Sequence, residues 1–599
     1  MLSICNSFLN KVTKIILLSS LFISYSFSST ATEDFIKKNK LYNDSYWSKL
    51  LHYKNGKSEV DSNNFFISKN GKTNLKEELL ETIDSLQNGT NNTLCRFPLR
   101  VKWLKEKIPN LESKIKKYQC KDLDLYLKEI NAKFASLIFP TSHINSPASM
   151  YGHTFLRLSG DEKTPLLGNA VNYAAQTEET NGLIFAYKGL FGGYKGKYSI
   201  LPYYKKIKEY SNLEQRDIWE YKLDLSQEEV EKIALHSYEL KDAYSFYYFF
   251  LENCSYNLLW LLEVARDDLE LVNNFYLKAA PLDTIKILKK YDLIKQSDYR
   301  YSKMTKMKHI LDNEILNKNY IKSFVKENKE LPTSLSLKDK AAYLDLKIEY
   351  TQYLRSKNKI EKKDYLKKYL KLLKQRSKIS IVSDYEIKKA SNPLFSHDSA
   401  RVSLTYNSDK TYELSGKPVY SNIYDISYGY LDGAYIDFFD LNLKKDDDRV
   451  FIDKFKILDI SSLSKRDELF KPLSWGIELS YERFKSQEDY MKLKPSFGVT
   501  YGNENYFIYA LGQSKAYNKL GDNLLSLGSK IGFVANKFED IKLGLSYEYD
   551  KYNKGFKNRN FEVFSTYKID ENLSLNLKYI NDNLIKQRDI SSFSLFYYF

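Results

Sequence analysis

Glycine and clustered basic residues are both scarce in this sequence, and each shortage argues against a class of ligand. The chain has 23 glycines among 599 residues, and the Gly-rich stretch at 187–196 lacks the spacing of a phosphate loop or dinucleotide fingerprint. A flap over a groove and a plain surface loop are both open interpretations of this stretch. The net charge is +16, but the lysines are spread along the chain, as on a solvated surface. We therefore expect no nucleic-acid partner, and we predict no cofactor and no metal.

Long apolar runs are also lacking, apart from one near the N-terminus. Lys11 and Lys14 precede the apolar run 15–27, and small residues follow it. This is the pattern of a secretory signal, and the run is too short for a comfortable membrane span. We therefore expect residues 1–30 to be a signal peptide and the mature protein to be exported. Cys5 precedes the apolar run, so we expect no lipoprotein-type cysteine at the cleavage point.

Cysteine is the third scarcity, because removal of the signal leaves only three. In an oxidising compartment two of the three are expected to pair, and Cys95 and Cys120 are close in sequence. We predict a disulfide between them, which leaves Cys254 as an odd thiol. Three free cysteines are the alternative.

The length of the chain and its changes of pattern indicate several domains. Residues 31–131 and 267–377 have helical periodicity, and we expect the second of these regions to be a spacer between two domains. Residues 132–266 contain short strands followed by a helix, which predicts a compact α+β domain.

The region 378–599 switches to a period of two. In 473–481 every second residue is apolar and the residues between are polar or glycine, and similar segments recur. About twelve such segments, separated by turns, are typical of a transmembrane β-barrel. A soluble sandwich would alternate in a similar way, but the last strand ends on Phe599, as bacterial outer-membrane barrels do. We predict an antiparallel barrel of about twelve strands in the outer membrane.

Cys254 is the candidate nucleophile. It follows Asn253 where an aromatic run gives way to an apolar helical run. A thiol in the first turn of a helix lies near the positive end of the helix dipole, which favours the thiolate. A buried structural cysteine is the alternative.

A cysteine nucleophile needs an imidazole partner, and often a third polar group that orients the ring. His153 begins a predicted strand and is the preferred partner of Cys254, whereas His143 lies in the preceding loop and His236 is expected to face solvent in mid-helix. Asn172, on the next predicted strand, is the candidate that orients the ring. The residues predicted to bind substrate are Ser149, Tyr151, Tyr194 and Asn253.

Three segments resemble the N-terminal periplasmic domain of the Lnb family, which comprises lipoprotein N-acyltransferases and their relatives. They are residues 95–98, 145–155 and 251–256, which read CRFP, NSPASMYGHTF and LENCSY. The similarity covers roughly residues 41–290.

The resemblance implies roles for two residues: Cys254 is the nucleophile and His153 is the base. The order of the histidine strand and the cysteine helix is also similar to circularly permuted papain-like folds, such as the lecithin:retinol acyltransferase and NlpC-type groups. Lnb acyltransferases carry membrane helices after this domain, whereas the present chain is predicted to carry a barrel. The acyl donor and acceptor of the family therefore do not transfer directly.

Three functions follow from these expectations. The leading one is an outer-membrane-anchored thiol acyltransferase that acts through a Cys-His dyad on the acyl groups of lipids or lipoproteins. Its partners would be membrane phospholipid and lipoproteins. The second is a cysteine peptidase or amidase acting on cell-wall peptides or envelope proteins. The third is a barrel without catalytic activity, with a periplasmic binding or plug domain.

Overall fold

The computed structural model describes residues 31–599, except for nine short gaps. The gaps are 90–91, 116, 143–149, 180, 328, 448, 485–487, 520–521 and 584–587. The predicted signal peptide, residues 1–30, lies outside the described residues. The chain divides into two compact units: residues up to 124 with 238–243, and residues 125–237 with 244–599.

The first unit is mainly helical, as its sequence pattern predicts. Trp47 and Trp103 stack in its core with ring centroids 5.4 Å apart. The fully buried Arg100 pairs with Glu78 at 3.1 Å, so neither charge is left unpaired in the interior. The elements are α2 (Ala31–Asn39), α3 (Ser45–Leu50), the hairpin β1 (Tyr53–Lys54) and β2 (Lys57–Ser58), α4 (Leu75–Asn88), α5 (Thr93–Arg96), α6 (Pro98–Lys107), α7 (Leu111–Lys114) and the start of α8 (Lys121–Ile130).

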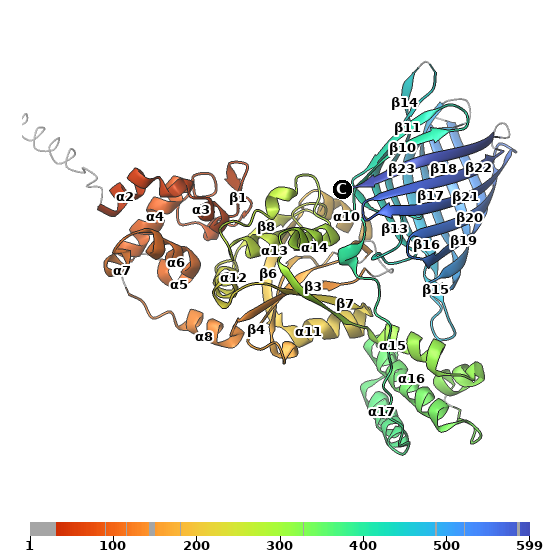
Figure 1. Ribbon diagram of the computed structural model, residues 1–599, viewed down its shortest axis with the longest axis horizontal. Coiled ribbons are helices and arrows are strands. Elements are labelled where there is room, and N and C mark those ends of the chain that lie inside the picture. Colours follow the sequence, from red (N-terminus) through yellow and green to blue (C-terminus); the bar gives the residue numbers. More distant parts are fainter. Residues whose placement is uncertain are drawn as a thin grey trace, which may run out of the picture. The chain divides into compact units, whose positions relative to one another are not determined.

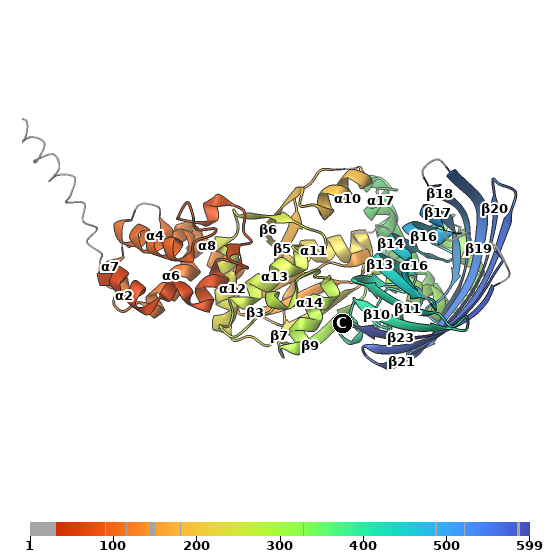
Figure 2. The same ribbon diagram turned by 90° about the horizontal axis from the view of Figure 1, so that it is seen from above.

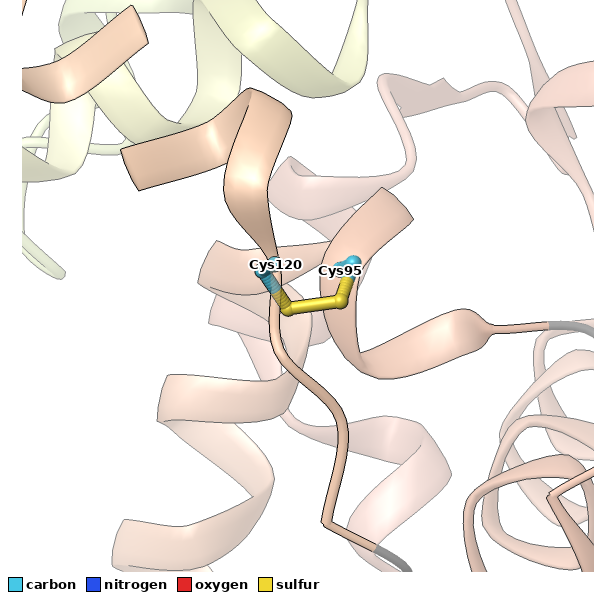
Figure 3. Close-up of a disulfide and its surroundings, with 2 residues drawn as sticks. All are labelled: Cys95 and Cys120. Carbon is cyan, nitrogen blue, oxygen red and sulfur yellow. A yellow bond between two sulfur atoms is a disulfide. The ribbon is translucent and has the colours of Figure 1, made fainter. Parts of the chain in front are cut away.

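The predicted disulfide joins Cys95 to Cys120 (Figure 3). Cys95 lies in α5, and Cys120 immediately precedes α8. The bond closes a loop across 25 positions, a length for which a disulfide typically contributes about 3 kcal/mol to stability.

The second unit begins with a seven-stranded antiparallel sheet of order β8-β6-β5-β4-β3-β7-β9. Every residue of α13 is buried, which makes this apolar helix the centre of the domain. The strands are β3 (Phe134–Pro140), β4 (Phe155–Ser159), β5 (Asn169–Ala175), β6 (Tyr194–Pro202), β7 (Ile218–Leu223), β8 (Tyr244–Tyr247) and β9 (Ile294–Arg300). The helices are α10 (Gly182–Leu190), α11 (Tyr203–Ile207), α12 (Gln227–Glu239), α13 (Cys254–Glu263) and α14 (Pro281–Lys290).

Three expectations about this region are wrong in detail. The Gly-rich stretch 187–196 is neither a flap nor a plain loop, because it forms the end of α10, a short turn and the start of β6. His236 is fully buried in α12 rather than facing solvent. Strand β9 lies within 267–377, where helix was expected, because it pairs with the edge of the sheet at β7. The more specific prediction of a permuted papain-like fold stays a prediction.

A helical region follows the sheet, and its buried apolar residues form one cluster around Tyr343 and Leu346. Its helices are α15 (Lys303–His309), α16 (Leu337–Ser356) and α17 (Lys362–Arg376). Among the residues that the structure describes, no helix combines the length and apolar character needed to cross a membrane.

The C-terminal region is a closed barrel of twelve antiparallel strands, as predicted (Figure 1). The ring closes because β10 pairs with β23 on one side, and β11 pairs with β13 on the other. The strands are β10 (Arg401–Asn407), β11 (Tyr412–Lys417), β13 (Ala434–Lys445), β14 (Val450–Ser462), β16 (Ser474–Phe484), β17 (Glu488–Gly502), β18 (Tyr506–Lys519), β19 (Asp522–Phe538), β20 (Ile541–Tyr552), β21 (Lys557–Asp570), β22 (Leu573–Asp582) and β23 (Arg588–Tyr598). The short β12 (Val419–Ser421) extends the pairing of β13, and β15 (Lys465–Arg466) pairs with β17.

The two faces of the barrel wall differ in polarity. Ser474, Glu478 and Ser480 of β16 are buried, whereas exposed apolar side chains such as Leu527 and Ile531 of β19 cover the outside. In a closed wall the backbone N–H and C=O groups of every strand are hydrogen-bonded to a neighbouring strand. Because the outer face is also apolar and suited to lipid, the barrel is of the outer-membrane type.

The segment 422–432, between β12 and β13, crosses the inside of the barrel. Its Asp425 pairs with Arg401 on β10, and its Asp432 accepts a hydrogen bond from Asn536 on β19 at 2.8 Å. Strands β10 and β19 lie on opposite sides of the ring. The segment therefore acts as a plug, and the charged cavity that remains beside it measures about 430 Å³.

Asp425→Ala should destabilise the barrel because Arg401 and Lys417 would both lose a buried carboxylate partner. Breaking a buried ion pair in this way typically costs about 3–5 kcal/mol. The midpoint of urea unfolding, followed by the heat-modifiable mobility of the folded barrel, measures the change.

Asp446→Ala is the matched control, because Asp446 pairs with Arg449 on an exposed turn. Such a surface pair contributes at most about 1 kcal/mol. Equal midpoints for the two variants would contradict the plug interpretation.

Candidate active site

Cys254 is the first residue of α13 and is 5% exposed. Asn253 caps the helix: its Oδ1 accepts from the backbone N–H groups of Ser255 at 3.0 Å and Tyr256 at 3.2 Å. The Asn253 amide also donates to the carbonyl of Ala279 at 2.7 Å. These bonds fix the thiol at the positive end of the helix dipole. Within the described residues, Cys254 is the free cysteine.

His153 lies beside this thiol, close enough for each group to shift the pKa of the other. It follows Gly152, whose φ of +98° is a conformation that side chains other than glycine rarely adopt. The His153 Nε2 atom lies 2.8 Å from Oδ1 of Asn172, in the middle of β5. If Nε2 carries the proton of this bond, the other ring nitrogen is left as the acceptor for the thiol proton. The structure thus brings the three predicted catalytic side chains together.

The pair changes the acidity of both partners. Burial by itself would raise the pKa of the Cys254 thiol, but the neighbouring His153 and the Thr154 backbone N–H lower the pKa to about 7. Burial by itself would lower the pKa of His153, but the Cys254 thiolate and Asn172 raise it above its usual range. The arrangement therefore favours a thiolate beside an imidazolium near neutral pH.

Tyr247, at the end of β8, is a site residue that the sequence did not reveal. Burial and the neighbouring Cys254 raise the pKa of its hydroxyl well above the usual range, so Tyr247 lies beside the thiol as a protonated phenol. The ring stacks on Tyr173 with centroids 6.3 Å apart. Tyr247 lies in an aromatic run, 244–250, and nothing in the sequence distinguishes it from the other aromatic residues there. Its position next to Cys254 is seen only in the folded structure.

The residues predicted to bind substrate are largely buried. Tyr151 and Tyr194 are buried, and Asn253 caps the helix. Ser149 lies outside the described residues, as does His143. Their contact with a substrate stays a prediction.

The loops that carry His153 and Cys254 pack against the barrel. The Tyr151 ring lies 4.7 Å from that of Phe249 and 5.7 Å from that of Tyr420, between centroids. The Phe250 ring lies 4.9 Å from that of Phe438 on β13. The barrel side chains of this buried cluster include Ile436, Phe438, Leu458, Ile460, Trp475 and Ile477.

These barrel side chains belong to the outer face of the wall. Phe438 and Ile436 flank Asp437, and Asp437 lines the charged cavity inside. Neighbouring side chains on a strand point to opposite faces, so Ile436 and Phe438 point outward. The loops of the candidate site therefore lie against the outer surface of the barrel, close to the first residues of β13.

Residues 122–291 match the family model described as the Lnb N-terminal periplasmic domain. Three further models, each described as a domain of unknown function, match residues 39–107, 297–386 and 390–599. No curated protein matches the chain.

Several solved outer-membrane proteins and porins are similar to this chain. The NanC porin is 8% identical with a TM-score of 0.24, and the match covers 34% of this chain and 99% of that one. The KdgM porin, solved in complex with disordered oligogalacturonate, is 13% identical with a TM-score of 0.23, covering 33% and 98%. Omp33 of Acinetobacter baumannii is 10% identical with a TM-score of 0.20, covering 34% and 99%. The chain joins a periplasmic domain of the Lnb N-terminal type to an outer-membrane β-barrel.

The rate at which iodoacetamide alkylates Cys254 should be proportional to the fraction of the thiol that is ionised. The rate should therefore rise with pH around pH 7 rather than near pH 9. His153→Ala removes the stabilising imidazolium and leaves burial, which raises the pKa of the thiol. The rate at pH 7 should therefore fall about tenfold or more. Intact mass against time, at a series of pH values, measures this profile.

His309→Ala is the control, because His309 lies on α15, outside the Cys254 and His153 contacts. Its pH profile should match that of the unaltered protein. A profile that His153→Ala leaves unchanged would show that the two groups do not interact.

Proposed function

We propose that this protein is an outer-membrane-anchored thiol acyltransferase that takes acyl groups from lipid. The observation that carries the proposal is the grouping of Cys254, His153 and Asn172 on loops whose aromatic side chains pack against the outer wall of the barrel. The likeness of residues 122–291 to a family that includes lipoprotein N-acyltransferases supports it.

The first step forms a thioester on Cys254. The thiolate attacks the carbonyl carbon of a lipid ester, and the carbonyl oxygen becomes an oxyanion. The Cys254 backbone N–H, which is fixed at the start of α13, and the Tyr247 hydroxyl, which can rotate, are the donors beside this position. When the ester C–O bond breaks, the His153 imidazolium gives its proton to the departing alkoxide, which leaves as a lyso-lipid hydroxyl.

The second step transfers the acyl group to an amine such as a lipoprotein N-terminus. The amine attacks the thioester while the neutral His153 takes one of its protons. The C–S bond then breaks, the product is an amide, and the Cys254 thiolate beside the His153 imidazolium is restored. Asn172 keeps the His153 ring in the tautomer that both steps require.

A cysteine hydrolase would use the same first step, with water in place of the amine. The contact between the site and the barrel favours lipid as the acyl donor. Phe249 and Phe250, shortly before Asn253, pack against side chains on the outer face of the barrel wall, which places the site beside the surface that lipid surrounds.

Intact mass spectrometry of the protein in phospholipid bilayers should detect an acyl adduct on Cys254. The adduct should be absent in Cys254→Ser, and addition of a lipoprotein-like peptide with a free N-terminus should discharge it. Leu167→Ala, an exposed position at the opposite end of β4 from His153, is the control and should form the adduct normally. Failure to form an adduct with any phospholipid or lipoprotein donor would refute the proposal, and discharge by water alone would identify a hydrolase.

Asn172→Ala should slow formation of the adduct about ten- to a hundredfold, because the His153 ring would lose its orientation. Asn172→Asp keeps an oxygen acceptor and should recover most of the rate, with a pH profile shifted upward by the added negative charge. Asn169→Ala, on the same strand, is the control and should retain the normal rate. Equal rates for Asn172→Ala and the unaltered protein would contradict the orienting role.

A further inference from the structure

We infer that an aromatic surface next to the candidate site lies within the inner leaflet of the outer membrane, in contact with phospholipid acyl chains. The surface consists of Ile184, Tyr187 and Phe191 in and after α10, with Phe246 and Tyr248 in and after β8. We call it the α10 surface. Figure 2 labels α10 near β6 and β5 of the same domain.

The α10 surface exposes large apolar side chains that a protein surface in water would not favour. Tyr187 is 66% exposed and Phe191 is 68% exposed, and their rings pack together with centroids 5.0 Å apart. Lys188 is the one charged residue in the sequence of α10. Burying one large apolar side chain contributes about 1.5–3 kcal/mol, so a cluster of this kind favours an apolar surrounding.

The α10 surface is joined to the loop that carries the nucleophile. The backbone N–H of Phe249 donates to the carbonyl of Gly189 at 2.8 Å. The Tyr248 ring lies so close to Gly192 that a Cβ atom there would clash with it. The end of α10 and the segment before Cys254 therefore form one continuous piece of surface.

The same surface continues onto the lipid-facing wall of the barrel. The Phe250 ring lies 5.3 Å from that of Phe249 and 5.8 Å from that of Phe439 on β13. Phe439 is 41% exposed on the barrel. A chain of ring contacts thus leads from the barrel wall toward α10. Because the barrel wall is surrounded by lipid, lipid is also the occupant that this continuity favours for the α10 surface.

The character of the side chains agrees with this location. Tyrosine and phenylalanine suit the boundary between headgroups and acyl chains, where the ring is apolar and the tyrosine hydroxyl stays hydrated. The Lys188 ammonium, paired with Glu179 at 3.7 Å, is placed at the edge of the surface, and a lysine can extend its charge to the headgroups.

The contact has a consequence for the substrate, and this step rests on the proposed function. An acyl chain in contact with the α10 surface would lie beside the segment 249–253, directly before Cys254, because the Phe249 N–H donates to the Gly189 carbonyl. The donor ester would then enter sideways from the inner leaflet, and the substrate class is a glycerolipid that is already in the bilayer.

Fluorescence quenching tests the membrane contact without any need for catalysis. In a Cys254→Ser background, with the Cys95–Cys120 disulfide intact, bimane is attached at Phe191→Cys or at Leu167→Cys. Leu167 is 81% exposed and lies beyond the far end of β4 from His153, which makes it a matched control. Both proteins are reconstituted in phosphatidylethanolamine and phosphatidylglycerol bilayers with and without brominated acyl chains.

We expect brominated lipid to quench bimane at position 191 strongly and at position 167 very little. Equal quenching at the two positions, weak or strong, would overturn the inference. Quenching at position 191 that does not require bromine would also overturn it, because it would indicate a protein partner or a second copy of the chain. These outcomes hold whether or not Cys254 has acyltransferase activity.

The entry of lipid is tested with the double variant Tyr187→Asp, Phe191→Asp. Acyl adduct formation from bilayer phospholipid should fall about tenfold or more, since two apolar contacts with lipid are lost. Iodoacetamide should still alkylate Cys254 at the normal rate, which shows that the site is intact. Leu167→Asp is the control and should change neither rate. An unchanged adduct rate in the double variant would refute lipid entry across the α10 surface.

Discussion

The packing of Tyr151, Phe249 and Phe250 on the outer wall of the barrel is the contact on which the rest of the arrangement depends. These rings belong to the two loops that carry His153 and Cys254. One buried cluster thus positions both reacting groups relative to the membrane. Burial of several aromatic side chains contributes several kcal/mol, which adds to the constraint that the connecting chain imposes on this domain.

The electrostatics of the site depend on this enclosure as well. A thiolate and an imidazolium attract each other more strongly where water is excluded, and Cys254 is nearly inaccessible. The cap provided by Asn253 and the Thr154 N–H add directed dipoles that do not need to reorganise during a reaction. The same burial makes an unpaired charge on either Cys254 or His153 unfavourable, so we expect the two groups to be charged together.

The sequence predicted the features that arise from local periodicity. Alternating apolar residues predicted the barrel and its approximate strand number, and the Asn253–Cys254 step predicted a capped cysteine at the start of an apolar helix, which is where Cys254 lies. Tyr247 lies only seven positions before Cys254, but its orientation in the site follows from the pairing of β8 with β6, which the aromatic run does not signal. The plug at 422–432 was missed for a similar reason, because a polar segment inside a barrel has the same composition as a surface loop.

The plug and the docking surface share one stretch of chain, because 422–432 lies between Tyr420 and Ile436, and both of these contact the periplasmic domain. The consequence concerns timing. Until the strands have closed into a ring, Asp425 has no enclosed partners and the outer wall that supports Phe250 does not exist. A newly exported chain would therefore travel through the periplasm with an incompletely supported thiol, and the reactive pair would be completed only on arrival in the bilayer. Insertion into the membrane would then be the step that completes the surroundings of Cys254 and His153.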